Sequence, residues 1–120
     1  MTVKDVIEQV EKLRPGSQLT PEESLRHLRT VEASINSNII CCFEDLTEKP
    51  LPEAIEDELL VPEMYSSLYC HFLAAQIDIM NGDITRYSNN MILYNALLSA
   101  FSDWCLRNYM PLQRGRVRWR

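Results

Sequence analysis

Glycine is scarce in this chain of 120 residues and occurs only at positions 16, 82 and 115. Loops that cradle phosphate groups need closely spaced glycines, so a glycine-rich nucleotide-binding loop is excluded. The chain also lacks any run of 18 or more apolar residues, which predicts that no helix spans a membrane. Its first residues, MTVKDVIEQVEKL, contain no apolar signal core, so we expect a protein that acts in the cytoplasm or is packaged into a particle assembled there.

Patterns typical of enzymes and metal sites are missing as well. The four cysteines, Cys41, Cys42, Cys70 and Cys105, include no Cys-x-x-Cys pair, which disfavours a zinc site shared with His71. Cys70 and His71 are adjacent, and adjacent helical residues point about 100° apart, so they cannot form a nucleophile–base pair. We expect reduced thiols, with Cys70 and Cys105 acting as small buried hydrophobes. We expect no metal, no cofactor and no catalysis.

Charge divides the chain into two parts. Residues 1–112 hold all 17 acidic residues and 8 of the 12 basic ones, a net charge of −9, whereas residues 113–120 hold four arginines and no acid. An acidic body argues against a protein that wraps nucleic acid, because such affinity comes mainly from neutralised phosphates. We therefore predict a single domain over residues 1–112 and a basic tail over residues 113–120. The residues expected to dock on a partner are Arg114, Arg116, Arg118, Trp119 and Arg120.

Apolar periodicity predicts four helices and hence an all-α, four-helix bundle-like domain. The first covers residues 2–13, is capped by Thr2, and ends at Pro15-Gly16. The second begins with a capping box formed by Thr20 and Glu23 and is expected to continue in phase to Phe43. The apolar faces of these two helices are expected at Val3, Val6, Ile7, Val10, Leu13, and at Leu25, Leu28, Val31, Ile35, Ile39, Cys42 and Phe43.

A long connection is predicted over residues 44–63, which contain eight acidic residues and only Lys49 as a base. Pro50 and Pro52 block regular structure there. The simplest interpretation is a solvated linker. The alternative is a surface that faces a basic partner or lines a channel.

A helical hairpin over residues 59–111 dominates the rest of the chain. Its first helix, residues 63–81, follows Val61-Pro62, is apolar on nearly all sides, and ends at Asn81-Gly82. A helix of that kind must be buried by its own domain or by another subunit. The second helix, residues 83–109, has apolar residues at Ile84, Tyr87, Met91, Tyr94, Leu98, Phe101 and Cys105, flanked by Leu93, Leu97, Ala100 and Trp104. The core anchors expected in the hairpin are Phe72, Tyr94, Leu98, Phe101 and Trp104.

The same hairpin carries an ordered series of motifs: LLVPEMYSSLY, LAAQIDIMNGDITRYSNNM, YNALLSAFSDW and RNYMP. Together with KDVIEQVEKLRP and VEASINSNII, which stand in the expected order, this series resembles the bacteriophage head–tail connector (neck adaptor) proteins. The resemblance covers residues 3–111. Ser88 and Tyr94 depart from it, since Asn and Phe are usual at those positions.

The resemblance implies a non-enzymatic virion protein that forms a ring, usually twelvefold, on the portal and joins the DNA-filled head to the tail. The implied partners are the portal protein and the tail or stopper proteins, with genomic DNA passing through the ring. Assembly would take place in the cytoplasm of the bacterial host. The candidate subunit-interface residues are Tyr65, Tyr69, His71, Asp78, Arg86, Asn89 and Asn90. The alternative function is a small helical regulatory or DNA-binding protein that uses the basic tail.

Overall fold

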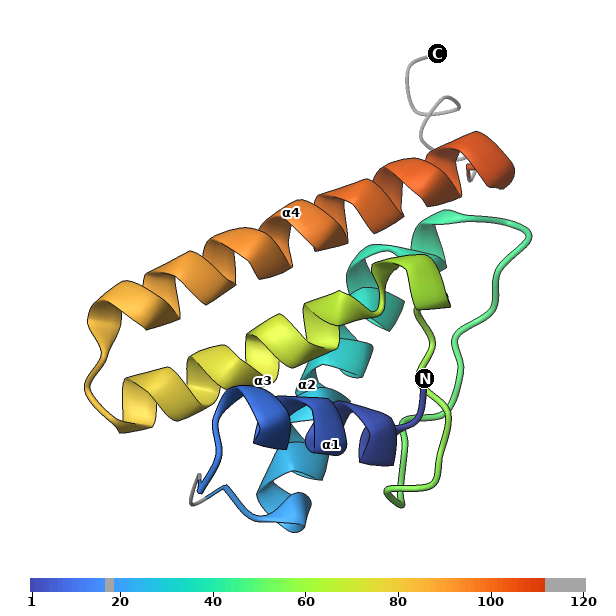
Figure 1. Ribbon diagram of the computed structural model, residues 1–120. Helices are drawn as coiled ribbons and strands as arrows, with labels where there is room; N and C mark the ends of the chain where they lie inside the picture. The colour runs from blue at the N-terminus through green and yellow to red at the C-terminus, as the bar shows by residue number, and fades with distance from the viewer. Residues whose placement is uncertain (17–18, 112–120) are drawn as a thin grey trace.

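The computed structural model describes residues 1–16 and 19–111 and has an all-α fold. The helices, in chain order, are α1 (Val3–Leu13), α2 (Pro21–Asn38), α3 (Ser67–Met80) and α4 (Ile84–Asn108), with short 3-10 helices η1 (Ile40–Cys42) and η2 (Glu63–Tyr65) between α2 and α3 (Figure 1). In the described part of the chain, β pairing is limited to two isolated bridges, Thr2 with Glu58 and Phe43 with Pro111. No helix among these residues is long and apolar enough to cross a bilayer. The predicted basic tail, residues 113–120, lies outside the described residues.

The helix ends with clear local signals lie where the sequence predicts them. The Thr2 side chain accepts a hydrogen bond from the backbone N–H of Asp5, and the Asp5 carboxylate accepts one from the backbone N–H of Thr2, which completes a capping box. Thr20 and Glu23 form the predicted capping box of α2. Gly82 has φ of 76°, in the left-handed region that glycine adopts without a steric penalty, and the chain reverses there between α3 and α4.

The end of α2 differs from the prediction. The helix stops at Asn38, five residues before Phe43, and the chain tightens into η1. A 3-10 turn places successive side chains at wider angular steps than an α-helix does, and here Ile40 enters the core while Cys42 is exposed. Phe43 is extended and pairs with Pro111, and the N–H of Glu44 donates to the carbonyl of Met110. The end of α2 is therefore set by contact with the end of α4.

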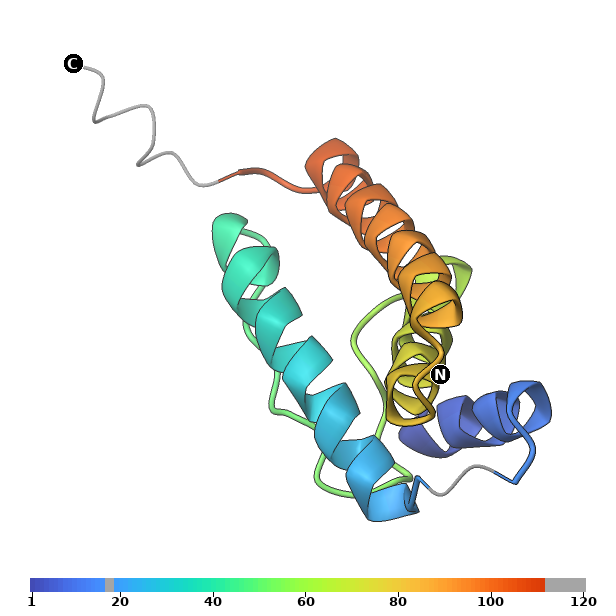
Figure 2. The ribbon, with the colours of Figure 1, turned by 90° about the vertical axis from the view of Figure 1, so that its left-hand side faces the viewer.

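Helix α3 occupies the centre of the fold and contacts α1, α2 and α4 (Figures 1 and 2). This position explains its apolar composition, because three helices of the same subunit cover it. Its fully buried side chains include Leu68, Tyr69 and Leu73, whereas Ile79 and Met80 are exposed at the hairpin turn.

Helix α4 lies antiparallel to α3, and this pair forms the largest helix–helix contact (Figure 1). Tyr94, Phe101 and Cys105 are its buried residues, and the ring of Tyr94 lies 5.1 Å from that of Phe72. The other expected anchors, Phe72, Leu98 and Trp104, are partly buried against the core.

Besides Cys42, three residues placed on apolar stripes by the sequence are exposed instead. They are Leu13, Ile84 and Leu93, at 53%, 61% and 48% exposure. Leu13 and Ile84 occupy helix ends, where no neighbouring helix extends over them. Leu93 lies on a flank of α4 that α3 does not cover, because no α-helix other than α3 contacts α4 in the described chain.

Candidate functional site

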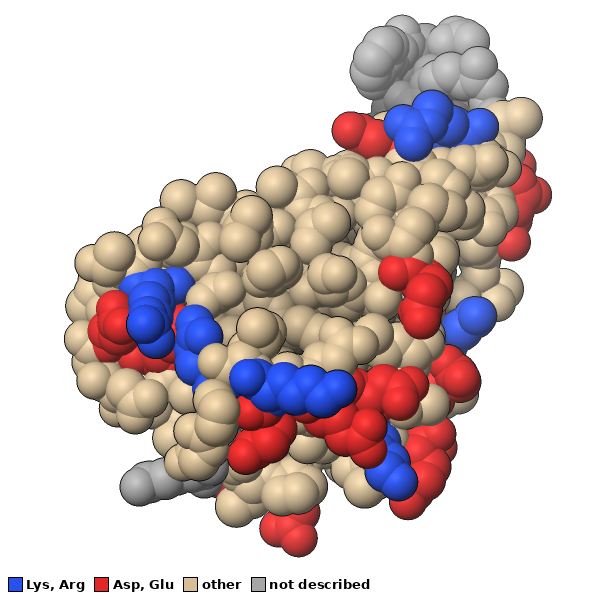
Figure 3. Space-filling view, viewed as in Figure 1, with Lys and Arg blue, Asp and Glu red and all other residues tan. Residues whose placement is uncertain are grey.

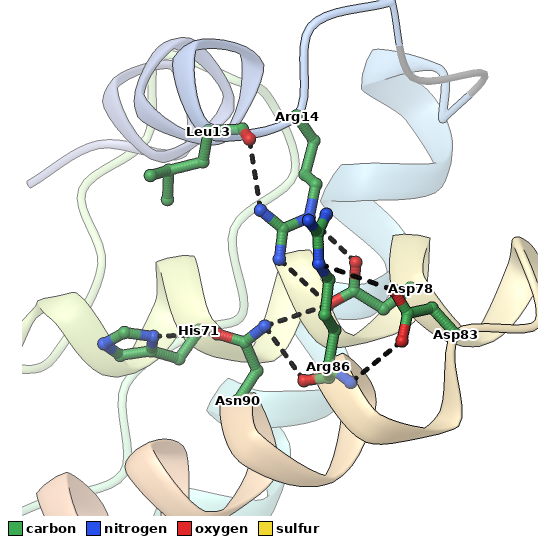
Figure 4. Close-up of polar contacts among 7 residues, drawn as sticks. All are labelled: Leu13, Arg14, His71, Asp78, Asp83, Arg86 and Asn90. Atoms are coloured by element: carbon green, nitrogen blue, oxygen red, sulfur yellow. Dashed lines mark hydrogen bonds and ion pairs between the residues drawn. The ribbon is translucent and has the colours of Figure 1, made fainter.

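A polar cluster joins the end of α1 to the α3–α4 hairpin (Figure 4). Its centre is Asp78, which is 2% exposed and faces Arg14. The Arg14 guanidinium donates to both carboxylate oxygens of Asp78, with Nε–Oδ1 at 2.8 Å and Nη2–Oδ2 at 3.0 Å. A third donation from Nη1 reaches the carbonyl of Leu13. The bidentate bond to Arg14 holds the pKa of Asp78 below its usual range, so the pair is ionised at neutral pH.

Asn90 of α4 extends this cluster across the hairpin. Its Nδ2 donates to Asp78 Oδ2 at 2.9 Å, which leaves Oδ1 as the acceptor for Nδ1 of His71 at 3.2 Å (Figure 4). The contact to Asn90 therefore places the His71 proton on Nδ1. His71 and Asp78, which lie seven residues apart on α3, are connected through Asn90. The cluster connects the end of α1 to α3 and α4, which indicates a structural role.

The candidate interface residues fall into three groups in the structure. Tyr69 and Asp78 are buried and bonded inside the subunit, which removes them as interface residues. His71 and Asn90 are partly buried and bond to each other, and Tyr65 packs beside the rings of Phe101 and Trp104. Arg86 and Asn89 are exposed on α4.

We expect Arg14→Ala to lower the free energy of unfolding by about 1–3 kcal/mol, because it leaves the buried Asp78 carboxylate with Asn90 as its remaining side-chain donor. Arg86→Ala is the matched control, since Arg86 forms an exposed pair with Asp83 and its loss should cost within about 0.5 kcal/mol. Urea denaturation followed by circular dichroism measures both. Equal effects of the two substitutions would contradict the structural role of Arg14.

A second polar cluster surrounds Glu32, which is 4% exposed on α2. The hydroxyl of Tyr69 donates to Glu32 Oε1, and the N–H of Leu60 donates to Oε2 at 2.9 Å. The same tyrosine oxygen accepts from the N–H of Val61 at 3.0 Å. Burial raises the pKa of Glu32, although both hydrogen bonds oppose that shift. Burial and the nearby Glu32 charge raise the pKa of Tyr69, so the tyrosine remains a hydrogen-bond donor.

Three polar residues on one face of α2 fasten the acidic connection to the domain. Arg29 Nη1 donates to the carbonyl of Pro52, and Asn36 bonds both the N–H and the carbonyl of Lys49. Glu32 lies between them and holds Leu60. Spacings of three and four residues place these side chains on the same side of the helix. The acidic side chains of this segment are exposed, as a solvated linker predicts, but its backbone is not free, since α2 fixes it at three points.

The segment that α2 holds in place lines an open groove of about 510 Å³, together with Glu32. Its lining combines apolar and acidic side chains: Glu32, Lys49, Pro50, Leu51, Pro52, Glu53, Asp57, Glu58, Leu59 and Leu60. A smaller apolar cleft of about 100 Å³ adjoins it and shares Lys49 and Leu60. The cleft reaches the end of α4 through Trp104 and Tyr109.

The four cysteines divide into an exposed pair, Cys41 and Cys42, and a buried pair. Cys70 and Cys105 are buried, and burial raises the pKa of the Cys70 thiol to about 11, so it carries almost no thiolate at neutral pH. Desolvation lowers the pKa of His27, whose ring lies edge-on to Phe72. Across residues 1–16 and 19–111, no three His, Cys, Asp or Glu side chains are grouped as a metal site would need.

No protein family, no curated protein and no solved structure matches the chain.

Proposed function

We propose that the chain is a head–tail connector subunit that forms a ring on a phage portal and joins the head to the tail. The ordered motifs over residues 59–111 support this proposal, because they form the α3–α4 hairpin. A connector must build one repeated contact with its neighbours. The proposal therefore depends mainly on an exposed, uncharged surface that could contact a neighbouring subunit.

That surface is the outward half of α4. Between Arg86 and Asp103 the helix has no charged residue, although the body as a whole is strongly acidic. Figure 3 shows an uncharged surface along most of this helix. Ile92 is 65% exposed and Leu93 is 48% exposed. The outward residues of this surface, which we name the α4 face, are Ser88, Asn89, Ile92, Leu93, Asn95, Ala96 and Ser99.

The α4 face suits contact between copies of the chain. Acidic surfaces of two copies repel each other, whereas the α4 face can be covered without burying an unpaired charge. Repetition of a heterologous contact generates a ring when the rotation closes. Repulsion elsewhere on the body favours isolated subunits in solution and assembly on a template, so we expect the purified protein to be monomeric or weakly associated.

We expect Ile92→Glu to abolish ring formation on the portal protein encoded in the same genome while leaving the fold intact. The substitution adds a charge at the centre of the α4 face, and burying that charge without a partner would prevent the contact. Thr30→Glu, at an exposed position on α2, is the matched control. Electron microscopy of portal mixed with each variant is the measurement. Ring density that persists with Ile92→Glu would contradict a role for the α4 face.

The basic tail is proposed as the element that docks on the portal or a neighbouring subunit. We expect a chain truncated after Leu112 to keep its helicity but to lose attachment to purified portal, and attachment of the full chain to weaken as salt rises. Co-sedimentation with portal over a salt series tests this. If the truncated chain attaches as well as the full chain, another element makes the contact. If the full chain binds DNA and not portal, the regulatory alternative is favoured.

A further inference from the structure

The acidic groove has more negative charge than the described residues neutralise. Residues 44–63 contain eight acidic side chains and one lysine. Within the described chain, the N-terminal amino group is the only cation that forms an ion pair with them, through Glu58 at 3.1 Å. Glu53 and Glu58 are exposed and both line the groove. A basic ligand would therefore find in Glu53 an exposed carboxylate that forms no ion pair within the described chain, close to Glu58, whose Oε2 is bound by the N-terminal amino group.

The groove also offers apolar walls. Leu59 is buried, Leu51 and Leu60 are partly buried, and Pro50 is exposed beside them. The walls are held in place by the bonds from Arg29 and Asn36 to the backbone of the segment. A ligand that alternates positive and apolar side chains matches this combination, because successive residues of an extended chain point in opposite directions.

The segment that alternates in this way is residues 113–120, which read QRGRVRWR and carry no acid. The described chain ends beside the grooves: Pro111 pairs with Phe43, and Tyr109 lines the small apolar cleft that adjoins the acidic groove. Eight extended residues span at most about 26–29 Å.

We infer that residues 113–120 dock in the acidic groove of their own subunit, with arginines against Glu53 and Glu58 and with Val117 and Trp119 against the apolar walls. Attachment to the same chain gives the tail an effective concentration of about a millimolar, so even a weak intrinsic affinity keeps the groove occupied. Docking there would cover the tail in the free subunit, and a portal surface would have to displace it. This inference does not depend on the connector function and can fail separately from it.

The test measures binding of a fluorescent peptide with the sequence of residues 113–120 to two forms of the protein by anisotropy. The form truncated after Leu112 should bind the peptide, and binding should weaken as salt rises. The full-length chain should bind about tenfold more weakly, because its own tail competes for the groove. Equal binding to the two forms would overturn the inference.

Two charge reversals locate the site. Glu53→Lys in the truncated form should weaken peptide binding about fivefold, because it replaces an attraction by a repulsion in the groove. Glu8→Lys makes the same charge change on the exposed side of α1 and should leave binding unchanged. Sedimentation should give the same mass for the full-length and the truncated chain at every concentration. Unchanged binding by Glu53→Lys, or a mass that rises with concentration and falls on truncation after Leu112, would contradict docking within one subunit.

Discussion

Phe101→Ala is expected to lower the free energy of unfolding by about 3–5 kcal/mol, because it removes a large buried side chain from the core. Phe101 is 2% exposed, and its ring stacks on that of Trp104 at 6.1 Å and lies 6.2 Å from that of Tyr65. The buried residues of helix α4 are Tyr94, Phe101 and Cys105, and Phe101 has the largest purely apolar side chain among them. Urea denaturation monitored at 222 nm provides the measurement.

The matched control for this prediction is Ile92→Ala on the same helix. Ile92 is 65% exposed, so its loss should change stability by no more than about 0.5 kcal/mol. Trp104 is partly exposed, and Trp104→Ala should therefore cost less than Phe101→Ala. A similar, small effect at Phe101 and Ile92 would show that α4 is attached to the domain by other residues.

The helices themselves could be predicted because their signals are local. Thr2 and Thr20 cap helices through bonds to residues three positions away, and Gly82 supplies the positive φ that reverses the chain. Apolar periodicity also identified the long C-terminal helix, which runs over Ile84–Asn108. Each of these features depends on residues only a few positions apart, so it can be predicted from the local sequence.

The end of α2 could not be predicted in the same way. The residues from Asn38 to Phe43 contain neither glycine nor proline, and their apolar pattern stays in phase with the helix. What ends the helix is the approach of residues 110–111, more than 60 positions further along the chain. A contact at that separation leaves no local signature.

The polar clusters also depend on contacts between distant residues, and only Glu32 carries a signal in the sequence. The sequence singled out Asp78, His71 and Asn90 but gave no indication that Arg14, 64 positions from Asp78, would pair with it. Glu32 was also missed, although it carries a signal: it stands four residues after Leu28 and three before Ile35, both on the apolar stripe of α2. A charged residue in phase with such a stripe predicts a buried carboxylate with local donors.

The Glu32 cluster links the helical domain to the acidic groove. One carboxylate accepts from α3 through Tyr69 and from the groove wall through Leu60. A disturbance at Glu32 therefore loosens both the core and the wall. The position of the groove depends on a bond made inside the domain.

Glu32→Ala is expected to lower the free energy of unfolding by about 2–4 kcal/mol. The Tyr69 hydroxyl and the Leu60 N–H would lose their acceptor, and each unsatisfied donor costs about 1–3 kcal/mol, partly offset because the carboxylate no longer has to be desolvated. Glu32→Gln should cost less, since its Oε1 can still accept from Leu60 and its amide can donate to the Tyr69 oxygen. Equal stability of the wild-type and Glu32→Ala proteins would contradict this role.

The pH dependence separates the charge of Glu32 from its shape. Burial raises the pKa of Glu32 in the folded protein above the ordinary glutamate value of 4.5, so the folded state binds more protons than the unfolded state between those two values. The free energy of unfolding attributable to this residue must then fall as pH rises through that window. Glu32→Gln cannot ionise and should remove that decline, which makes the wild type lose stability relative to the variant as the pH rises above 4.5. Denaturation curves of both proteins across this range measure the difference, and a difference that is constant with pH would show that Glu32 titrates normally in the folded state.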